Sequence, residues 1–141
     1  MSQYDTQNVF AKILRGEMPA ERVYEDEKTL AFMDIMPRAD GHVLVIPKAA
    51  ARGLLDVQAD DLAATMATVQ KVAAAAKAAF AADGITIQQF NEPAGGQVVF
   101  HLHVHILPRH DGVPLRPHTG QMADKALVAA HAEKIRAAIA G

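Results

Sequence analysis

The sequence predicts an α+β fold in which an antiparallel sheet of about five strands is accompanied by one long and two shorter helices. Two observations support this class. Short apolar runs are separated by short turns, which is typical of antiparallel strands. One alanine-rich stretch, residues 58–82, is long enough to form a helix that covers a face of the sheet.

Composition limits what the chain can be. It has 141 residues, half of them hydrophobic, which suits one globular domain with a workable core. The net charge is −2, with 14 basic and 16 acidic residues interspersed, so we expect no nucleic-acid polymer as a partner. The absence of cysteine excludes disulfides, thiolate metal sites and a cysteine nucleophile.

No apolar run suggests a membrane or export. The first seven residues are polar and lack the apolar core of a signal peptide. No stretch approaches the roughly 20 apolar residues that span a bilayer. We therefore expect a cytoplasmic location and no membrane partner.

The first predicted element is a short helix over residues 9–16. Asn8 can cap its start and Gly16 can end it. Its apolar residues recur at helical spacing and form one face: Val9, Phe10, Ile13 and Leu14. Simple core packing explains this face at least as well as a binding role does.

Three strands are expected in the N-terminal half. Residues 23–25 and 29–33 pair through the charged turn between them. Residues 42–46 form a nearly continuous apolar strand that Pro47 stops. Asp34 stands at the end of the second strand, where a carboxylate is more often a turn former than a ligand.

The long helix over residues 58–82 has a broad apolar stripe, and Gly84 is placed to stop it. The stripe consists of Leu62, Met66, Val69, Val72 and Phe80. Residues 85–90 alternate at period two, which predicts the next strand. The loop 91–96 that follows is either an ordinary hairpin connection or, because of its glycines, a place where backbone N–H groups approach phosphate oxygens.

Histidines alternate with aliphatic residues over 101–108, which predicts a strand. At about 3.3 Å per residue, His101, His103 and His105 would share one face, with neighbours roughly 6.6 Å apart. An unperturbed pKa of about 6.5 suits histidine to proton transfer or nucleophilic attack near neutral pH. Two alternatives stay open: a metal site built from these histidines, and a strand that merely exposes them.

The C-terminal part, residues 110–141, begins with an irregular segment in which His110 and His118 are expected at the surface. A final helix over 123–140 completes the chain. Its apolar side is formed by Leu127, Ile135 and Ile139 and could pack on the sheet or on another subunit.

Two segments resemble the histidine triad (HIT) family of nucleotide hydrolases and transferases. One is residues 95–109, which contain the three histidines. The other runs from Asp34-Ile35-Met36-Pro37 through Gly41-His42 to Leu44-Val45-Ile46-Pro47-Lys48. The resemblance extends over residues 9–109. It implies a single HIT-like domain over 1–141 with the α+β fold predicted above, usually as a homodimer whose sheets join.

The resemblance also implies a mechanism in which an imidazole attacks the α-phosphorus and forms a phosphoramidate intermediate. In the family the middle histidine attacks, which maps onto His103. His105 would bind the phosphate. His101 and His42 would form a relay that delivers a proton to the leaving group.

Further roles follow from the same comparison. Asp34 would accept hydrogen bonds from the ribose hydroxyls. The resemblance thus favours a ligand at this position, whereas the general expectation for a carboxylate at a strand end is a turn former. Gln97 and Asn91 would hold the phosphate or the leaving group. The nucleobase pocket would be formed by Phe10, Ile13, Phe32, Ile35 and Leu44.

The zinc ligands of some family members are missing. Those members carry a Cys-x-x-Cys pair where this chain has Asn8 and Ala11. They also have a histidine shortly after the Ile-Pro-Lys segment, where this chain has Ala49-Ala50-Ala51. Three of four expected ligands are therefore absent, and we expect neither a metal nor another cofactor.

The resemblance implies hydrolysis at the α-phosphate of a purine nucleotide, at a phosphoramidate P–N bond or a phosphoanhydride. Histidine at position 105, where the nucleotidyltransferase branch has glutamine, favours hydrolysis over transfer. The ending Leu107-Pro108-Arg109 is shared with branches that prefer dinucleoside polyphosphates, so that substrate class stays open. A different class of function, binding of a nucleotide or partner protein without turnover, is the remaining alternative.

Overall fold

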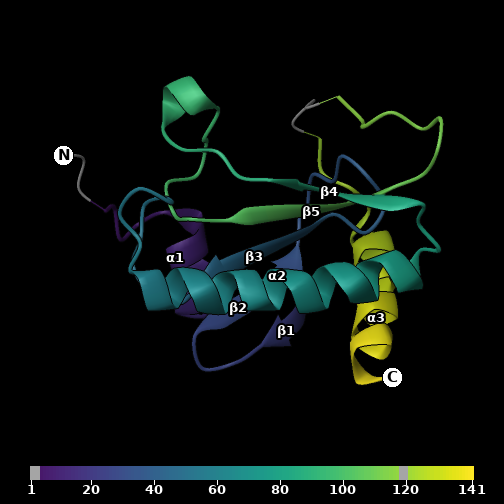
Figure 1. The fold of residues 1–141 in the computed structure, drawn as a ribbon, viewed down its shortest axis with the longest axis horizontal. Coiled ribbons are helices and arrows are strands. Elements are labelled where there is room, and N and C mark those ends of the chain that lie inside the picture. Colours follow the sequence, from purple (N-terminus) through teal and green to yellow (C-terminus); the bar gives the residue numbers. More distant parts are fainter. Residues whose placement is uncertain (1–3, 118–120) are drawn as a thin grey trace.

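The computed structural model describes residues 4–117 and 121–141, so the predicted surface position of His118 lies outside the described residues. Five strands form one sheet: β1 (Arg22–Glu25), β2 (Thr29–Met33), β3 (Val43–Pro47), β4 (Gly84–Gln88) and β5 (Val104–Arg109). The helices are α1 (Val9–Leu14), α2 (Ala59–Ala79), the short 3-10 helix η1 (Pro93–Gly95) and α3 (Lys125–Ala140). This arrangement confirms the predicted α+β class (Figure 1).

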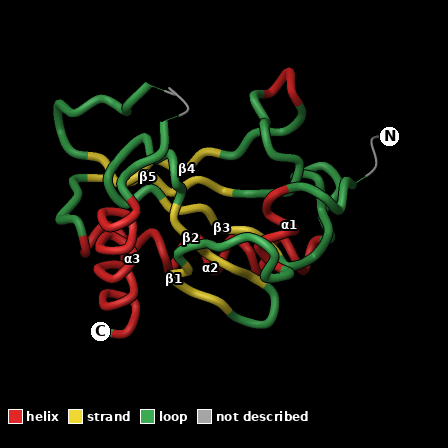
Figure 2. Tube along the Cα trace, turned by 180° about the vertical axis from the view of Figure 1, so that it is seen from behind, coloured by secondary structure: helices red, strands yellow, loops and turns green. Residues whose placement is uncertain are grey.

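The sheet has the order β1-β2-β3-β5-β4, and every neighbouring pair is antiparallel. Helix α2 crosses one face of it, and α1 lies on the opposite face (Figures 1 and 2). Both faces are therefore covered near β2 and β3, which explains why every residue of these two strands is buried.

Alternating residues of the strands build two separate cores. On the side of α2 and α3, a large core contains Val43, Val45, Val104 and Ile106 together with helix residues such as Val72. On the side of α1, a smaller core is formed by Phe10, Ile13, Leu30, Phe32, Leu44 and Ile46. Since Val104 and Ile106 face the large core, His103 and His105 point to the α1 side of the sheet.

The structure confirms the predicted residues at both ends of α1. Asn8 caps this helix, because its side-chain oxygen accepts a hydrogen bond from the backbone N–H of Ala11 at 2.9 Å. Gly16 follows the helix with a left-handed φ of +78°, as its position past the last turn suggested.

The predicted strand over 101–108 is wrong at its start, because β5 begins only at Val104. Strand β4 ends at Gln88, so residues 101–103 have no ladder partner on that side. The backbone N–H of Leu102 instead donates to the carbonyl of Ala51 at 2.9 Å. The three histidines consequently do not lie along one regular strand.

The long helix also differs from its prediction in detail. It ends at Ala79 rather than at 82, and Gly84 belongs to β4 instead of stopping the helix. Met66 is 43% exposed, whereas Thr68 faces the sheet and shares a 2.7 Å hydrogen bond with Thr29. Val69 and Val72 of the predicted stripe are buried as expected, and smaller residues complete the buried side of the helix: Thr65, Thr68, Ala75 and Ala76.

The C-terminal helix packs within the chain, against α2 and β1. Its buried residues are Val128, Ala132 and Ile135, while Leu127, expected on the apolar side, is 46% exposed. Among residues 4–117 and 121–141, none of the helices combines the length and apolar character needed to cross a membrane.

One turn brings Gly41 and His42, which precede β3, against the end of α2; the strand predicted over 42–46 thus begins one residue later, at Val43. Gly41 has a φ of +83°, and a Cβ there would lie 2.5 Å from the ring of Phe80. The left-handed conformation and the close contact both require glycine. The position of the turn before β3 therefore depends on a residue with no side chain.

We predict that Gly41→Ala lowers the free energy of unfolding by about 3 kcal/mol, because backbone strain adds to overpacking against Phe80. The matched control is Gly112→Ala, at a φ of +78° with nothing within 4 Å of its Cβ, which should lose only about 1 kcal/mol. Urea unfolding of both variants measures the difference. Equal losses of unfolding free energy would show that the ring of Phe80 moves aside without destabilising the fold.

Candidate active site

His103 lies at the start of β5, under helix α1. The ring of Phe10 meets it edge-on at 4.9 Å between centroids, and the ring of His105 lies at 5.0 Å. Nδ1 of His103 is 2.7 Å from the backbone carbonyl oxygen of His101. A carbonyl oxygen only accepts hydrogen bonds, so Nδ1 carries the hydrogen and Nε2 keeps the lone pair.

Burial favours the neutral form of this imidazole. Desolvation lowers the pKa of His103 below its ordinary value of 6.5. The side chain still keeps 8% of its surface exposed, whereas His101 is 0% exposed. Of these two histidines, His103 is therefore the one that reaches the surface.

His101 is buried and bonded through both of its ring nitrogens. Its Nε2 donates to the carbonyl oxygen of Pro47 at 2.8 Å, which leaves Nδ1 to accept from the hydroxyl of Tyr4 at 2.5 Å. Burial lowers the pKa of His101 to about 4. Both ring nitrogens of His101 are bonded to these partners, and the contacts of the described residues join neither nitrogen to His42, so the relay between them stays a prediction. His101 anchors the backbone that holds His103.

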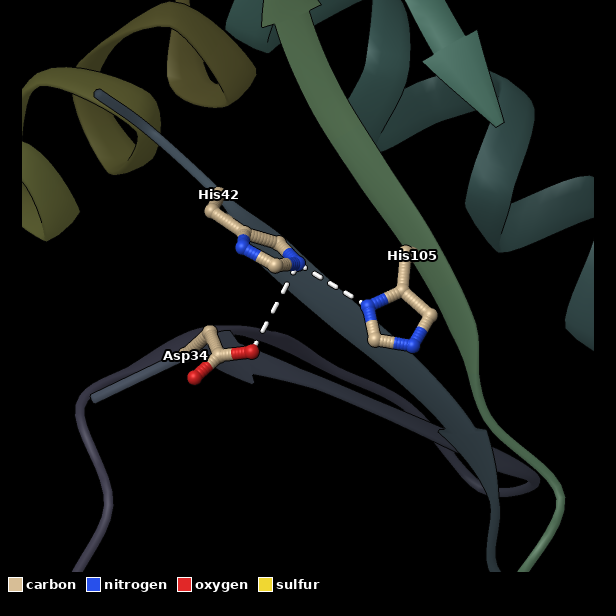
Figure 3. A group of neighbouring side chains, drawn as sticks. All are labelled: Asp34, His42 and His105. Carbon is tan, nitrogen blue, oxygen red and sulfur yellow. Dashed lines mark hydrogen bonds and ion pairs between the residues drawn. The ribbon is translucent and has the colours of Figure 1, made fainter. Parts of the chain in front are cut away.

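His42 instead pairs with His105, beside Asp34 (Figure 3). The backbone N–H of Arg38 donates to His42 Nδ1 at 3.1 Å, so the hydrogen of His42 is on Nε2. His42 Nε2 lies 2.9 Å from His105 Nδ1 and donates to it. The hydrogen of His105 is then on Nε2, which makes that nitrogen a donor.

Asp34 makes the turn-forming contact considered from the sequence, and its role toward the ribose stays a prediction. Its Oδ1 accepts from the backbone N–H of Met36 at 2.8 Å, which is the turn-forming contact. Its Oδ2 lies 3.5 Å from His42 Nε2. The carboxylate is therefore at the edge of the histidine pair while it also shapes the turn.

Asp34, His42 and His105 are also the described residues that could hold a metal ion, with one ligand atom each within 4.8 Å of one another. Two imidazole nitrogens bound to one tetrahedral zinc at about 2.0 Å would stand roughly 3.3 Å apart, and each would direct a lone pair at the ion. Here the two nitrogens share a proton at 2.9 Å. The geometry fits a hydrogen-bonded pair better than a metal centre.

Four of the five residues predicted for the base pocket come together. Phe10, Ile13, Phe32 and Leu44 belong to the smaller core on the α1 side, and the Phe10 and Phe32 rings meet edge-on at 5.3 Å. Ile35 is not part of this cluster and is 46% exposed. The structure thus places an aromatic and aliphatic surface next to His103.

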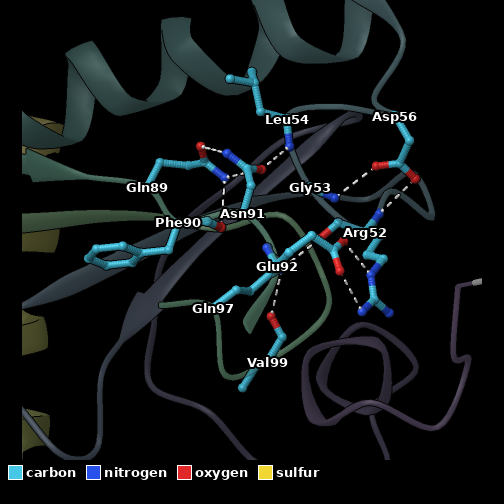
Figure 4. Close-up of polar contacts among 10 residues, drawn as sticks. All are labelled: Arg52, Gly53, Leu54, Asp56, Gln89, Phe90, Asn91, Glu92, Gln97 and Val99. Atoms are coloured by element: carbon cyan, nitrogen blue, oxygen red, sulfur yellow. Dashed lines mark hydrogen bonds and ion pairs between the residues drawn. The ribbon is translucent and has the colours of Figure 1, made fainter. Parts of the chain in front are cut away.

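Gln97 does not have the free amide that phosphate binding would need. Its Nε2 donates to the carbonyls of Arg52 at 2.7 Å and Val99 at 3.0 Å, and its Oε1 accepts from the N–H of Glu92 at 2.8 Å (Figure 4). Both amide hydrogens are used within the protein. Gln97 braces the loop that precedes the histidines.

Asn91 is held in the same loop. Its Oδ1 accepts from the backbone N–H of Leu54 at 2.8 Å, and its Nδ2 donates to Gln89 at 2.9 Å (Figure 4). Arg52 adds an ion pair to Glu92 at 2.7 Å. These contacts join the segment after β3 to the loop after β4.

Tyr4 and Arg38 were not identified from the sequence. Tyr4 is 97 residues from His101, and Arg38 contributes through its backbone N–H rather than its side chain. No periodicity or spacing in the sequence marks either contact.

Comparison with known proteins identifies the family of the chain. A family profile described as HIT domain matches residues 15–112, which include all four histidines of the site. The chain belongs to the HIT domain family. Both the fold and the sequence resemblance are therefore confirmed.

Two solved HIT structures are closely similar. A HIT-like protein involved in cell-cycle regulation from Bartonella henselae, with unknown ligand, is 51% identical, with 97% of this chain and 99% of that one covered and a TM-score of 0.93. A zinc-bound histidine triad family protein from Mycobacterium smegmatis is 37% identical, with 96% and 94% covered and a TM-score of 0.85.

One HIT relative has a named activity. The adenylylsulfatase HINT3 of Arabidopsis thaliana is 38% identical over 103 residues, which is 73% of this chain and 52% of that protein. The chain thus spans about half the length of this relative. Hydrolases of nucleotide derivatives therefore occur within the family.

We predict that His101 makes the stability of this HIT protein sensitive to acid. An unfolded His101 takes up a proton below pH 6.5, whereas the folded one stays neutral down to about 4. The free energy of unfolding should therefore fall between pH 6.5 and 4, by up to about 3 kcal/mol from this residue.

The measurement compares urea unfolding of the wild type and of His101→Gln across this pH range. Glutamine can donate to Pro47 and accept from Tyr4 without titrating. The wild type should lose more stability than the variant as the pH falls. Parallel curves would mean that His101 is not kept neutral by burial.

Proposed function

We propose that this HIT protein hydrolyses purine nucleotides at the α-phosphate through a nucleotidyl intermediate on His103. The observation that carries the proposal is the 2.7 Å hydrogen bond from His103 Nδ1 to the carbonyl of His101. It aims a protonated nitrogen at the backbone and leaves the Nε2 lone pair for attack. The lowered pKa of His103 supports the same role, because only the neutral imidazole is a nucleophile.

In the first step, Nε2 of His103 forms a bond to the α-phosphorus while the bond from phosphorus to the leaving group breaks. In the second step, water attacks the same phosphorus and the P–N bond to His103 breaks. The proton taken up by the leaving group is balanced by the proton that the water releases. The net reaction consumes one water and returns the protein unchanged.

The His42–His105 pair is the proposed phosphate-binding group. His105 offers Nε2–H to a phosphoryl oxygen because His42 donates to its Nδ1 at 2.9 Å. A donor aimed at charge that grows in the transition state stabilises it more than it stabilises the substrate. His42 thus supports His105, in place of the relay with His101 that the sequence suggested. No metal is needed for these steps.

The remaining contacts are proposed for recognition of the nucleoside. Phe10, Ile13, Phe32 and Leu44 would contact the base, with Ile35 at the exposed edge. Asp34 would accept from the ribose hydroxyls through Oδ2. Asn91 and Gln97 would act through the position of their loop, since their side chains already bond within the protein.

The leaving group defines two candidate substrate classes. Similarity to an adenylylsulfatase supports a small group on the α-phosphate of an adenylyl nucleotide, of which a phosphoramidate is another example. A dinucleoside polyphosphate remains the second candidate because of the Leu107-Pro108-Arg109 ending. A binding module without turnover is the alternative of another class.

Three wider expectations stay predictions: a single domain over residues 1–141, a cytoplasmic location, and a homodimer. The homodimer has one structural argument. Strand β4 is at the edge of the sheet and Ile87 on it is 44% exposed, so a second copy could extend the sheet there.

We predict that His103→Ala reduces turnover of an adenosine phosphoramidate by at least about a thousandfold and changes nucleotide binding by less than about threefold. The control is His110→Ala, whose ring bonds the carbonyl of Phe80 at the end of α2. Rapid alkaline quenching of the wild type should trap an acid-labile nucleotide on His103. Label on His105, or turnover by His103→Ala, would contradict the assignment.

The same assay separates the alternatives. Faster cleavage of diadenosine polyphosphates than of phosphoramidate would favour the second substrate class. Tight binding of adenosine monophosphate with no turnover of either substrate would identify a binding module.

We predict that Asp34→Ala weakens binding of adenosine monophosphate about tenfold more than binding of its 2′,3′-dideoxy analogue. Loss of the hydrogen bond to Met36 affects both ligands alike, so the difference isolates the ribose contact. Calorimetric titration of both proteins with both ligands gives the four affinities. Equal losses would assign Asp34 to the turn alone.

A further inference from the structure

We propose that Arg116 is a positioning residue that keeps the His42–His105 pair in its active tautomer. Arg116 lies in the segment between β5 and α3, beyond the residues 15–112 that match the family. None of the contacts of the described residues joins Arg116 to His42 or His105. It acts through the turn that contains Arg38. The inference rests on the proposed function, in which His105 donates to phosphate.

Arg116 and Arg38 hold each other through reciprocal bonds. The backbone N–H of Arg116 donates to the carbonyl of Arg38 at 2.8 Å. Nε of Arg38 donates to the carbonyl of Arg116 at 2.8 Å. The guanidinium of Arg116 also forms an ion pair with Asp40. We call these contacts the Arg116 clasp.

One backbone group, the N–H of Arg38, connects the clasp to His42. The N–H of Arg38 is the donor to His42 Nδ1, at 3.1 Å. This bond requires a lone pair on Nδ1, so it selects the His42 tautomer that has its hydrogen on Nε2. The donor belongs to the same residue whose carbonyl and side chain are held by Arg116.

The tautomer of His42 sets that of His105. If the turn shifts and the Arg38 N–H no longer reaches Nδ1, His42 can carry its hydrogen there instead. His42 Nε2 would then accept, and Nδ1 of His105 would have to donate to it. Nε2 of His105 would lose its hydrogen and present a lone pair to the phosphate. A stabilising donor would thus become a repelling acceptor.

The C-terminal segment contacts the same loop at a second place. The backbone N–H of Ala123 donates to the carbonyl of Ile35 at 2.9 Å, next to Asp34. A cavity of about 110 Å³ is lined by residues of both segments, among them Arg38, Asp40 and Arg116. The loop from 35 to 40 is therefore held at two places, and the turn near Arg38 borders open space into which it can move when the clasp is weakened.

The ion pair itself contributes little to stability. The side chains of Arg116 and Asp40 are 50% and 52% exposed, and exposed pairs stabilise a fold only weakly. Loss of the Arg116 side chain should thus leave the fold intact. Its effect is expected on the histidine pair, where a small shift of one N–H changes which nitrogen is protonated.

The experiment uses two clasp variants that both keep the backbone N–H of residue 38. Arg116→Ala removes the ion pair with Asp40 and keeps the bonds made by the backbone of residue 116, whereas Arg38→Ala removes the bond from Nε of Arg38. Arg116→Lys is the conservative variant, because lysine can pair with Asp40. The matched control is Arg136→Ala, which removes exposed ion pairs to Glu21 and Glu133 and a bond to the carbonyl of Arg22 at the start of β1.

The first readout is ¹⁵N NMR of the histidine rings near neutral pH without substrate. The wild type, Arg116→Lys and Arg136→Ala should show His42 with its hydrogen on Nε2. Both clasp variants should show a substantial population with hydrogen on Nδ1. The second readout is hydrolysis of adenosine phosphoramidate, for which kcat should fall about tenfold in the clasp variants with KM changed less than about twofold.

The two readouts separate this inference from the proposed function. A tautomer shift in the clasp variants supports the positioning role even if the wild type hydrolyses nothing. An unchanged His42 tautomer in both clasp variants overturns it, whether or not kcat falls. An equal shift in Arg136→Ala also overturns it, because the effect would then come from any lost surface arginine.

Discussion

The hydrogen bond from His103 Nδ1 to the carbonyl of His101 is the constraint on which the rest of the site depends. It exists because the backbone leaves the strand geometry over residues 101–103 and bonds to Ala51 instead. In a regular strand, successive carbonyls point sideways to a neighbouring strand and not toward the side chain two residues on. The irregular start of β5 thus determines which nitrogen of His103 has the lone pair.

Several polar residues near this bond serve to hold it. His101 is anchored by Tyr4 and Pro47, and the preceding loop is braced by Gln97 and Asn91. Buried polar groups need partners, and most of those partners lie far away in the sequence. His101, Gln97 and Asn91, which the sequence suggests as ligands, therefore stabilise the backbone around His103 through hydrogen bonds within the protein.

The two cores lie on opposite faces of the sheet, and only the smaller one adjoins the candidate site. The large core under α2 and α3 contains the aliphatic side of β5, whereas the smaller core under α1 adjoins His103. Because side chains alternate along a strand, one segment can pack on one face and carry histidines on the other. The turn 37–41 then brings His42 to His105 from a neighbouring strand.

The sequence by itself determined the α+β class, all five strands to within a few residues and the cap of α1, since periodicity, turns and capping are local. The repeated histidines also indicated the site. Tertiary structure alone decided where β5 begins, which residues of α2 and α3 are buried, and that His42 pairs with His105 rather than His101. A histidine's tautomer depends on the partner of each nitrogen, and here these partners are backbone groups and side chains up to 97 residues away. No local pattern records such a contact, so the chemical role of each imidazole emerges only when the chain is folded.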